Sequence, residues 1–412
     1  MERFFELAEL MGHDADLLRA GEELETTLTV DDVDQLRELL GGDATAEERA
    51  ARGRRLRARA PDLMDPSAVT EAALLRRVEV HVYGDEPMSD ADRRSVAAAF
   101  PLDVLAVSAV DKTLAPNEVW NLGTSSSPVV VNLGTLTMEP GSSIVVRNTV
   151  LALNVGTLVR NGAQDADDRA ARAATANYDL AILGATGTTP PAGEVGKAGG
   201  TGSPGDKGNC QSPGVRGDPG GPGKEGTSGA RGGVGQPGEA GHPALAATVA
   251  IKPGGITGSS PRFVMLTRSG TGGAGALGGR GGTGGAGGAG GKGETCGCEG
   301  NHGGNGGTGG RGGTGGTGGT GGNGTDGNEI FVRVPTGQAK LIITSREQAP
   351  PGNGGVGGAG GTGGVGGVGG EGGKRYPGGR PGGSHGGGSN GQPGKEGKLA
   401  GAPGLITVSE SG

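Results

Sequence analysis

Residues 278–292 read GGRGGTGGAGGAGGK, a run of Gly-Gly-X triplets. The same pattern recurs over 303–322 and 354–373, and every third residue from Gly193 to Gly241 is glycine except Gln211. Segments with so few large side chains cannot offset the conformational entropy of folding by apolar burial. These tracts are therefore either disordered or ordered by pairing of their backbones.

A period of three matches the polyproline II helix, which has three residues per turn and no internal hydrogen bonds. A Gly-Gly-X tract in this conformation has two bare faces, so neighbouring backbones can approach and pair. We expect the decorated face of the third block, which carries Val356, Val365 and Val368, to be buried. We expect the threonine-rich face of the second block to be exposed to solvent.

Short apolar segments flank the glycine blocks and predict strands. They lie at 248–251, 263–266, 329–334, 340–344 and 405–408.

Residues 102–162 are rich in Val, Leu, Thr and Asn and contain a small repeat. Asn121-Leu122-Gly123-Thr124 recurs at 132–135 and at 154–157, at offsets of 11 and 22 residues. This spacing predicts stacked strand units in which Asn and Gly turn a corner, in a β-solenoid or a β-sandwich. Chance similarity between three short copies is the alternative.

Residues 1–101 are predicted to be mostly helical. Apolar residues have helical spacing up to Leu40, 45–48 forms a capping box for the next helix, and Ser89 begins a short helix that stops before Pro101. Residues 78–83 alternate like a strand. The second helix carries many arginines, interpreted as a solvated face, with a docking surface for an acidic partner or RNA as the alternative. These arginines are Arg49, Arg52, Arg54, Arg55, Arg57 and Arg59.

Together these patterns predict an α+β fold with a fibrous part. A helical attachment region would span 1–101, a β-solenoid or β-sandwich platform 102–183, and a polyglycine II (polyproline II-type) helix bundle interleaved with strands 184–412. The first glycine block also suits a collagen-like trimeric stalk, since triplets such as Gly217-Asp218-Pro219 place proline in the third position.

The net charge of −7 favours solubility and gives no reason to expect nucleic acid binding. No secretory signal is visible after Met1, and no stretch is long and apolar enough to span a bilayer. We expect cytoplasmic synthesis, with an extracellular or particle-associated destination reached by a non-classical route as the alternative.

Candidate chemical sites are few. Cys296, Cys298 and His302 are weak candidates for metal ligands, because zinc usually needs a fourth ligand and a wider cysteine spacing. A disulfide involving Cys210 and free thiols are the alternatives. No catalytic constellation or dinucleotide fingerprint can be placed, so the sequence predicts no enzyme and no cofactor.

The Gly-Gly-X runs at 278–292, 303–322 and 354–373 resemble the polyglycine II bundles of T-even-like phage tail-fibre adhesin tips and of the snow flea antifreeze protein. They are also similar to the repeats of mycobacterial PE-PGRS proteins, although the Pro-Glu N-terminal signature is absent. Residues 1–162 resemble none of these families. The adhesin resemblance implies an N-terminal attachment region and a rigid display domain with receptor-binding loops.

We therefore expect a non-enzymatic structural or display protein, such as an adhesin or an assembly component. It would bind a protein partner or larger assembly through residues 1–101, with a cell-surface receptor or self-association as further partners. Ice binding on the face with Thr308, Thr314, Thr317 and Thr320 is an alternative function. A collagen-like trimeric stalk and an enzyme with its site before residue 163 are the others.

Overall fold

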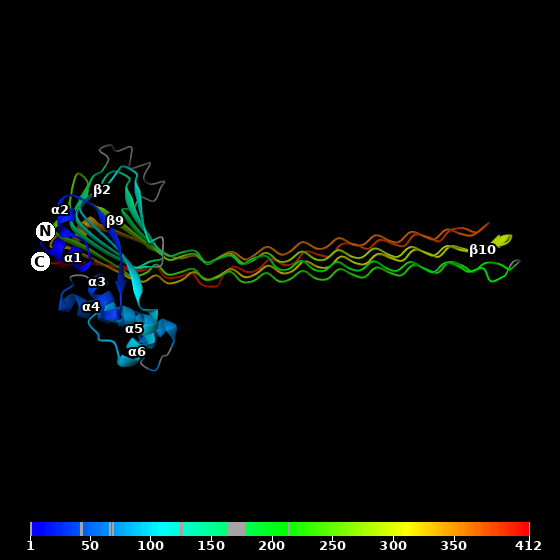
Figure 1. Ribbon diagram of the computed structural model, residues 1–412, viewed down its shortest axis with the longest axis horizontal. Helices are drawn as coiled ribbons and strands as arrows, with labels where there is room; N and C mark the ends of the chain where they lie inside the picture. The colour runs from blue at the N-terminus through cyan, green and yellow to red at the C-terminus, as the bar shows by residue number, and fades with distance from the viewer. Residues whose placement is uncertain are drawn as a thin grey trace.

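The computed structural model describes residues 2–41, 44–65, 67, 70–123, 127–162, 178–212 and 215–411. The chain forms a head, which holds both termini, and a long narrow arm (Figure 1). Thr124 of the predicted repeat lies outside the described residues, as does 163–175, which the polar sequence predicts to be a helix or a loop.

The helices of the head begin at polar capping residues. Thr45 accepts from the backbone N–H of Glu48, whose side chain accepts from the N–H of Thr45, so the predicted capping box is confirmed. Ser89 caps α6 as predicted. The helices are α1 (Glu2–Leu10), α2 (Ala15–Arg19), α3 (Val33–Leu40), α4 (Ala46–Arg59), α5 (Glu71–Tyr83) and α6 (Asp90–Val96), with 3-10 turns η1 (Pro61–Met64), η2 (Ala97–Ala99) and η3 (Ala339–Leu341).

From the second strand onward, successive strands of the head alternate between two sheets. The seven-stranded sheet has, in spatial order, β1 (Leu24–Val30), β2 (Leu102–Leu114), β4 (Val129–Met138), β6 (Leu151–Arg160), β8 (Ala247–Thr257), β12 (Glu329–Pro335) and β14 (Leu405–Ser411). The five-stranded sheet has β13 (Ile342–Glu347), β9 (Phe263–Arg268), β7 (Leu180–Leu183), β5 (Ser143–Arg147) and β3 (Val119–Leu122). All of these pairs are parallel except β1 with β2.

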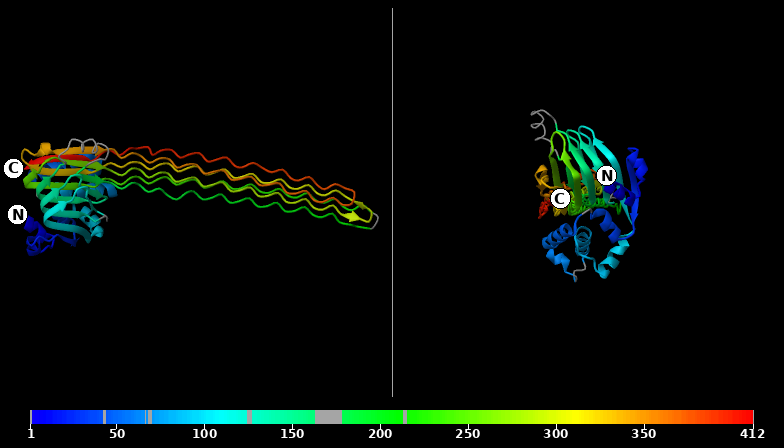
Figure 2. Two further views of the ribbon diagram at one scale, coloured as in Figure 1. Left: turned by 90° about the horizontal axis from the view of Figure 1, so that it is seen from above. Right: turned by 90° about the vertical axis from the view of Figure 1, so that its left-hand side faces the viewer.

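The main core lies between the two sheets, where Leu133, Leu153, Ile144 and Phe263 are buried. A second core lies on the other face of the seven-stranded sheet, where α3, α4 and α5 cover it and Tyr83 packs against Phe331. The head therefore has a helical layer, a mixed sheet and a parallel sheet (Figure 2).

Three long excursions of the chain form the arm. They leave the ends of β7, β9 and β13 and return to the starts of β8, β12 and β14. We number their six halves tract 1 (184–209), tract 2 (217–243), tract 3 (269–294), tract 4 (301–328), tract 5 (349–373) and tract 6 (377–404). Figure 2 shows the tracts running side by side from the head to the far end.

Backbone hydrogen bonds join the tracts at every third residue. Gly196 donates to Arg280 and Gly281 donates to Ala359, which links tracts 1, 3 and 5 in one layer. Tracts 2, 4 and 6 form a second layer in the same way, as in the bond from Gly229 to Arg311. Antiparallel bonds join the two layers. The layers thus continue the strand order of the two sheets.

Close backbone contact explains the glycine content of the arm. A Cβ at Gly285 would lie 2.0 Å from the carbonyl oxygen of Gly200, and one at Gly310 would lie 1.9 Å from that of Thr227. Such distances are far inside van der Waals contact, so a side chain there would push two tracts apart.

The fold class predicted from the sequence is wrong. The chain has an α/β fold with a seven-stranded mixed sheet, a five-stranded parallel sheet and few helices. It is not an α+β protein with a β-solenoid or β-sandwich platform and a polyglycine II bundle, and its architecture is neither collagen-like nor that of a fibre. The prediction is wrong because it assigns the fold to the glycine blocks. The strands that flank these blocks pair in register with strands before residue 184 and bury the apolar core, and the glycine blocks only connect them.

Some of the predicted strands are confirmed and one is wrong. The strands predicted around the glycine blocks are confirmed as β8, β9, β12, β13 and β14. The strand predicted at 78–83 is wrong, because this segment is the end of α5, where Val80, Val82 and Tyr83 are buried together and hide the helical period.

The last two copies of the repeat face each other in β4 and β6, with Asn132 opposite Asn154. They lie within these strands and form no corner, so only the 22-residue offset reflects strand pairing.

The predicted burial of the valine face is also wrong. Val356, Val365 and Val368 are 66%, 65% and 68% exposed. The inner faces of tract 5 are occupied by its neighbours, and no layer covers the remaining face. The threonine face is wet as predicted, since Thr314 and Thr320 are exposed.

Candidate functional site

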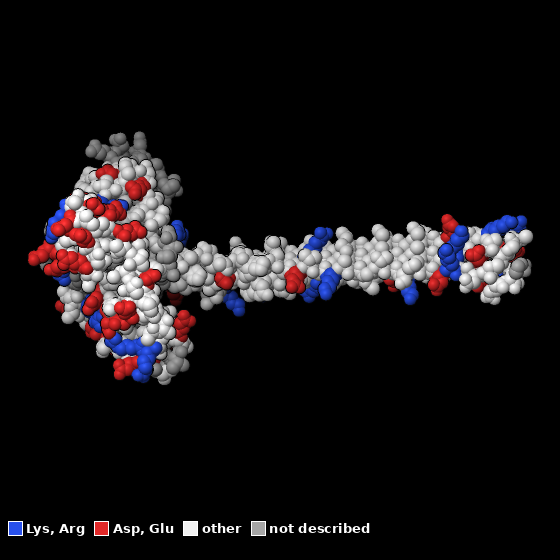
Figure 3. All heavy atoms as spheres, in the orientation of Figure 1, with Lys and Arg blue, Asp and Glu red and all other residues white. Residues whose placement is uncertain are grey.

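The far end of the arm, which we call the tip, gathers the three loops between paired tracts. Its described residues are 209–212, 215–218, 294–302 and 373–380. The tip contains the three cysteines of the chain, the small hairpin β10 (Thr295–Cys296) with β11 (Glu299–Gly300), and Tyr376, the one aromatic residue of the arm. In Figure 3, charged side chains are dense on the head, sparse along the arm and dense again toward the tip.

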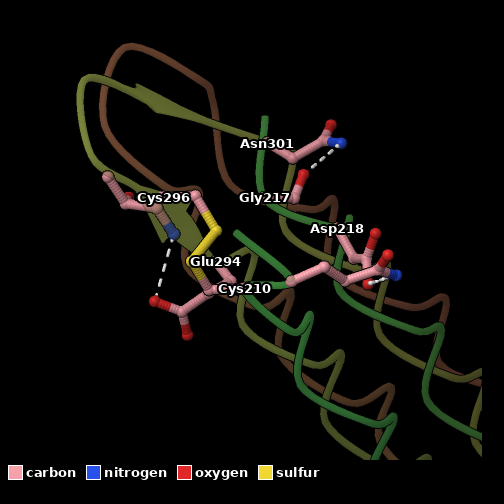
Figure 4. Close-up of a disulfide and its surroundings, with 8 residues drawn as sticks. Cys210, Gly217, Asp218, Glu294, Cys296 and Asn301 are labelled. Carbon is pink, nitrogen blue, oxygen red and sulfur yellow. Dashed lines mark hydrogen bonds between the residues drawn. A yellow bond between two sulfur atoms is a disulfide. The ribbon is translucent and has the colours of Figure 1, made fainter. Parts of the chain in front are cut away.

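A disulfide between Cys210 and Cys296 ties the first loop to the hairpin (Figure 4). Their Cα atoms are 5.3 Å apart, and 86 positions separate them in sequence. Nearby, the amide nitrogen of Asn301 donates to the carbonyl of Gly217 at 2.9 Å. Cys298, two residues further along the hairpin, is an exposed free thiol.

Arg216 connects all three loops. Its guanidinium donates to the Gly300 carbonyl and to Asn301, and it lies 4.2 Å from the ring centroid of Tyr376. On another side, the ring of His302 meets Tyr376 edge to face with centroids 5.1 Å apart. These contacts hold the ring of Tyr376 between a guanidinium and an imidazole.

An open groove of about 660 Å³ starts beside this cluster. Its lining comes from tracts 2, 4 and 6 and is mostly polar. The side chains concerned are Pro222, His302, Asn305, Pro377 and Arg380. The Asn305 oxygen accepts from the backbone N–H of Arg380 at 2.8 Å, which holds the two residues in register across tracts 4 and 6. The groove can offer a guanidinium, an imidazole, an amide and backbone groups to a polar ligand.

Two of the cavities among the described residues of the head are candidate sites. One of about 630 Å³ lies between the N-terminal helix and the seven-stranded sheet, beside Asn132, Thr157 and Lys252. The other, of about 400 Å³, is mostly apolar and lies under α5, with Arg76 and Glu79 as its charged residues. These two are ion-paired with each other at 2.7 Å. Neither cavity combines a nucleophile with a base in a recognisable catalytic arrangement.

Buried charges lie between the helices and the seven-stranded sheet. Burial raises the pKa of Glu79 and of Glu329 above their ordinary values. Burial also lowers the pKa of Arg52 to about 10, and its guanidinium lies 4.7 Å from the ring centroid of Phe331. Thr407 donates to Glu329 at 2.9 Å. These groups attach the helical layer to the sheet, so part of the arginine-rich face of α4 is structural and not solvated.

The structure separates the weak metal candidates. Cys296 is in the disulfide, Cys298 is exposed, and His302 packs against Tyr376. Within the described ranges, no three or more His, Cys, Asp or Glu side chains are grouped so as to hold a metal ion.

Sequence reasoning missed the cluster of Arg216, Asn301 and Tyr376. The one available signal was Tyr376, an isolated aromatic residue inside a glycine block. The residues that contact it, Arg216 and His302, are 160 and 74 positions away and become neighbours only because three loops end at the same place.

Comparison with family models, curated proteins and solved structures finds no match to this chain. In the part of the chain that the structure describes, no helix has the length and apolar character needed to cross a membrane.

Proposed function

We propose that this chain is a non-enzymatic display protein, an adhesin or assembly component whose arm holds a recognition surface away from the head. One observation supports this most strongly. All three excursions turn at the same far end, and the disulfide, the hairpin and the Arg216–Tyr376–His302 cluster are gathered there.

The arm suits this role because its order does not depend on a large core. A tract of 25 residues can extend at most about 3.3–3.6 Å per residue, which limits the reach to roughly 90 Å. Each interior tract is bonded to several neighbours, so its many individually weak backbone hydrogen bonds act together. In this proposal the head attaches to a partner through residues 1–101, and the tip meets the target.

Ice binding is less well supported. The threonine row of tract 4 is interrupted by Arg311, and Arg231 donates to Thr317 at 3.2 Å. These charged groups break a flat, regular hydroxyl surface.

A cell-binding assay tests the proposed function. Both termini lie in the head (Figure 1), so a fluorescent protein fused to the C-terminus leaves the tip free. We expect the full chain to bind a subset of a panel of bacterial and eukaryotic cells, and Arg216→Ala with Tyr376→Ala to weaken that binding. Binding that survives both substitutions but is lost on changing exposed residues of α1 would place recognition in the head.

A further inference from the structure

Two glycines of tract 6 have no packing reason to be glycine. A Cβ at Gly386 would meet nothing within 4 Å, and one at Gly383 would meet only a methyl group of Thr308 at 4.0 Å. By contrast, a Cβ at Gly388, two residues further along tract 6, would lie 1.9 Å from the Gly313 oxygen. Gly383 and Gly386 are exposed and leave bare backbone where side chains would fit.

These glycines continue the polar groove. Arg380, Gly383 and Gly386 are three residues apart in tract 6, and each of their carbonyls accepts a hydrogen bond from a glycine of tract 4. They therefore lie on one side of the tract, the side on which Arg380 lines the groove. A bare strip thus runs from the groove at the tip toward the head.

Positive charge accompanies this strip. Arg311 of tract 4 lies beside Gly386, because the N–H of Gly312 donates to the Gly386 carbonyl. The same three-residue spacing places Arg231 of tract 2 and both Lys395 and Lys398 of tract 6 on this side. The acidic residues in the corresponding positions are Glu225 of tract 2 and Asp326 of tract 4. We call the outer surface of tracts 2, 4 and 6 the basic face.

We infer that the basic face, from the groove at Arg380 across Gly383 and Gly386, binds a linear anionic polysaccharide. Its acid groups would meet Arg380 and Arg311, and its hydroxyls would meet Asn305, Thr308 and exposed backbone groups. Glycine without a side chain lets a sugar ring approach the backbone closely. Exposed ion pairs are individually weak, so a polymer that meets several of them is favoured over a small anion. This inference rests on the proposed function, because it names the class of target that the arm would meet.

Single-stranded nucleic acid is a poorer match to this surface. Base stacking needs open aromatic faces, whereas the ring of Tyr376 already contacts Arg216 and His302.

The test uses the full chain immobilised through a C-terminal tag, with binding measured by biolayer interferometry. The probes are alginate, which carries carboxylates, dextran sulfate, which carries sulfates, and neutral dextran and poly-dT as comparisons. We expect binding to at least one of the two anionic polysaccharides, weakening as salt increases, and none to neutral dextran. Which of the two binds better identifies the acid group.

The variants separate a built site from general charge attraction. Arg311→Ala should weaken binding by roughly two- to fivefold, the range expected from an exposed ion pair. Gly386→Leu should also weaken binding, because its side chain would occupy the bare strip that a sugar ring would contact. Arg280→Ala removes the same charge from tract 3, in the other layer, and should leave the affinity unchanged. A Cβ at position 386 would meet nothing within 4 Å, and an unchanged melting temperature of Gly386→Leu will verify its folding.

Several results would overturn the inference. One is no binding to either polyanion at low salt. Another is an equal loss of polyanion affinity in Arg280→Ala and Arg311→Ala. A third is that poly-dT binds as tightly as the polysaccharides and that Gly386→Leu does not change its affinity. Cell binding that depends on Arg216 without polyanion binding would overturn the ligand class and leave the proposed function standing. Cell binding that is independent of Arg216, Tyr376, Arg311 and Arg380 alike would remove the proposed function itself.

Discussion

Replacing Gly388 and Gly386 by alanine compares two positions in one tract that differ only in packing. A Cβ at Gly388 would lie 1.9 Å from the Gly313 oxygen and 2.4 Å from its carbonyl carbon, whereas a Cβ at Gly386 meets nothing within 4 Å. Ordinary contact begins near 3.4 Å, so tract 6 must move about 1.5 Å away from tract 4 in Gly388→Ala.

That movement breaks or weakens three hydrogen bonds. Gly388 donates to Gly361 at 2.8 Å, Gly315 donates to Ser389 at 2.9 Å, and Gly312 donates to the Gly386 carbonyl at 3.2 Å. At about 0.5–1.5 kcal/mol each, their loss costs about 1.5–4.5 kcal/mol. Alanine returns about 0.4–1 kcal/mol by restricting the unfolded chain, and in Gly386→Ala this gain stands alone.

Hydrogen–deuterium exchange measures the local opening of the hydrogen bonds between tracts 4 and 6. Electron-transfer fragmentation of the intact chain gives the exchange rate of each residue. We expect the amides of Gly312 and Gly315 to exchange roughly 10- to 1,000-fold faster in Gly388→Ala than in Gly386→Ala. Equal protection in the two variants would refute the claim that backbone contact dictates glycine in the arm.

Three further predictions concern the tip and the head. Reducing the disulfide at the tip removes a link worth roughly 2–4 kcal/mol of loop closure, so trypsin should cut the tip loops faster, and an unchanged cutting rate would contradict its clamping role. Burial raises the pKa of Glu329 above 4.5, so the stability that its protonated form contributes is present below that pH and lost as pH rises through the folded-state pKa. Glu329→Gln should therefore raise the urea midpoint at neutral pH and flatten this pH dependence. Hydrogen bonds from backbone N–H groups lower the pKa of Glu410, so its stabilising effect should be lost as pH falls. If stability changed with pH equally in Glu329→Gln and Glu410→Gln, the opposite pKa shifts of the two carboxyls would be contradicted. Asp179→Ala breaks a buried ion pair with Arg160 at 2.7 Å and should cost about 3–5 kcal/mol in urea unfolding, against at most about 1 kcal/mol for Arg268→Ala in an exposed pair, and similar costs would contradict the calculation.

Local signals in the sequence were sufficient where one segment determines its own structure. The capping box at Thr45 and the strands β8, β9, β12 and β14 depend on short-range chemistry and were predicted. The fold class depends on which strands pair across intervals such as the one between β6 and β8, and composition contains no such information. The glycine blocks dominated the prediction because they dominate the composition, although the buried core is built by the strands between them.

The candidate site was hidden for a related reason. Arg216, Asn301 and Tyr376 belong to three separate loops, and they come together because the three excursions have similar lengths. The valine row of tract 5 was wrongly predicted to be buried. Val356 and Val365 form a regular apolar pattern, but the described part of the arm has no layer that covers them. Periodicity shows which residues share a face but does not show what covers that face.

The most direct test of the account is small-angle X-ray scattering with in-line molar mass on the full chain. An ordered arm held by a single chain predicts a mass of 40.0 kDa and a profile in which a compact head extends into a narrow rod no longer than roughly 90 Å. A flexible, coil-like profile at the same mass would mean that the tracts do not pair in solution, and the arm could not display its tip. A mass of three chains would contradict an arm whose six tracts come from one chain.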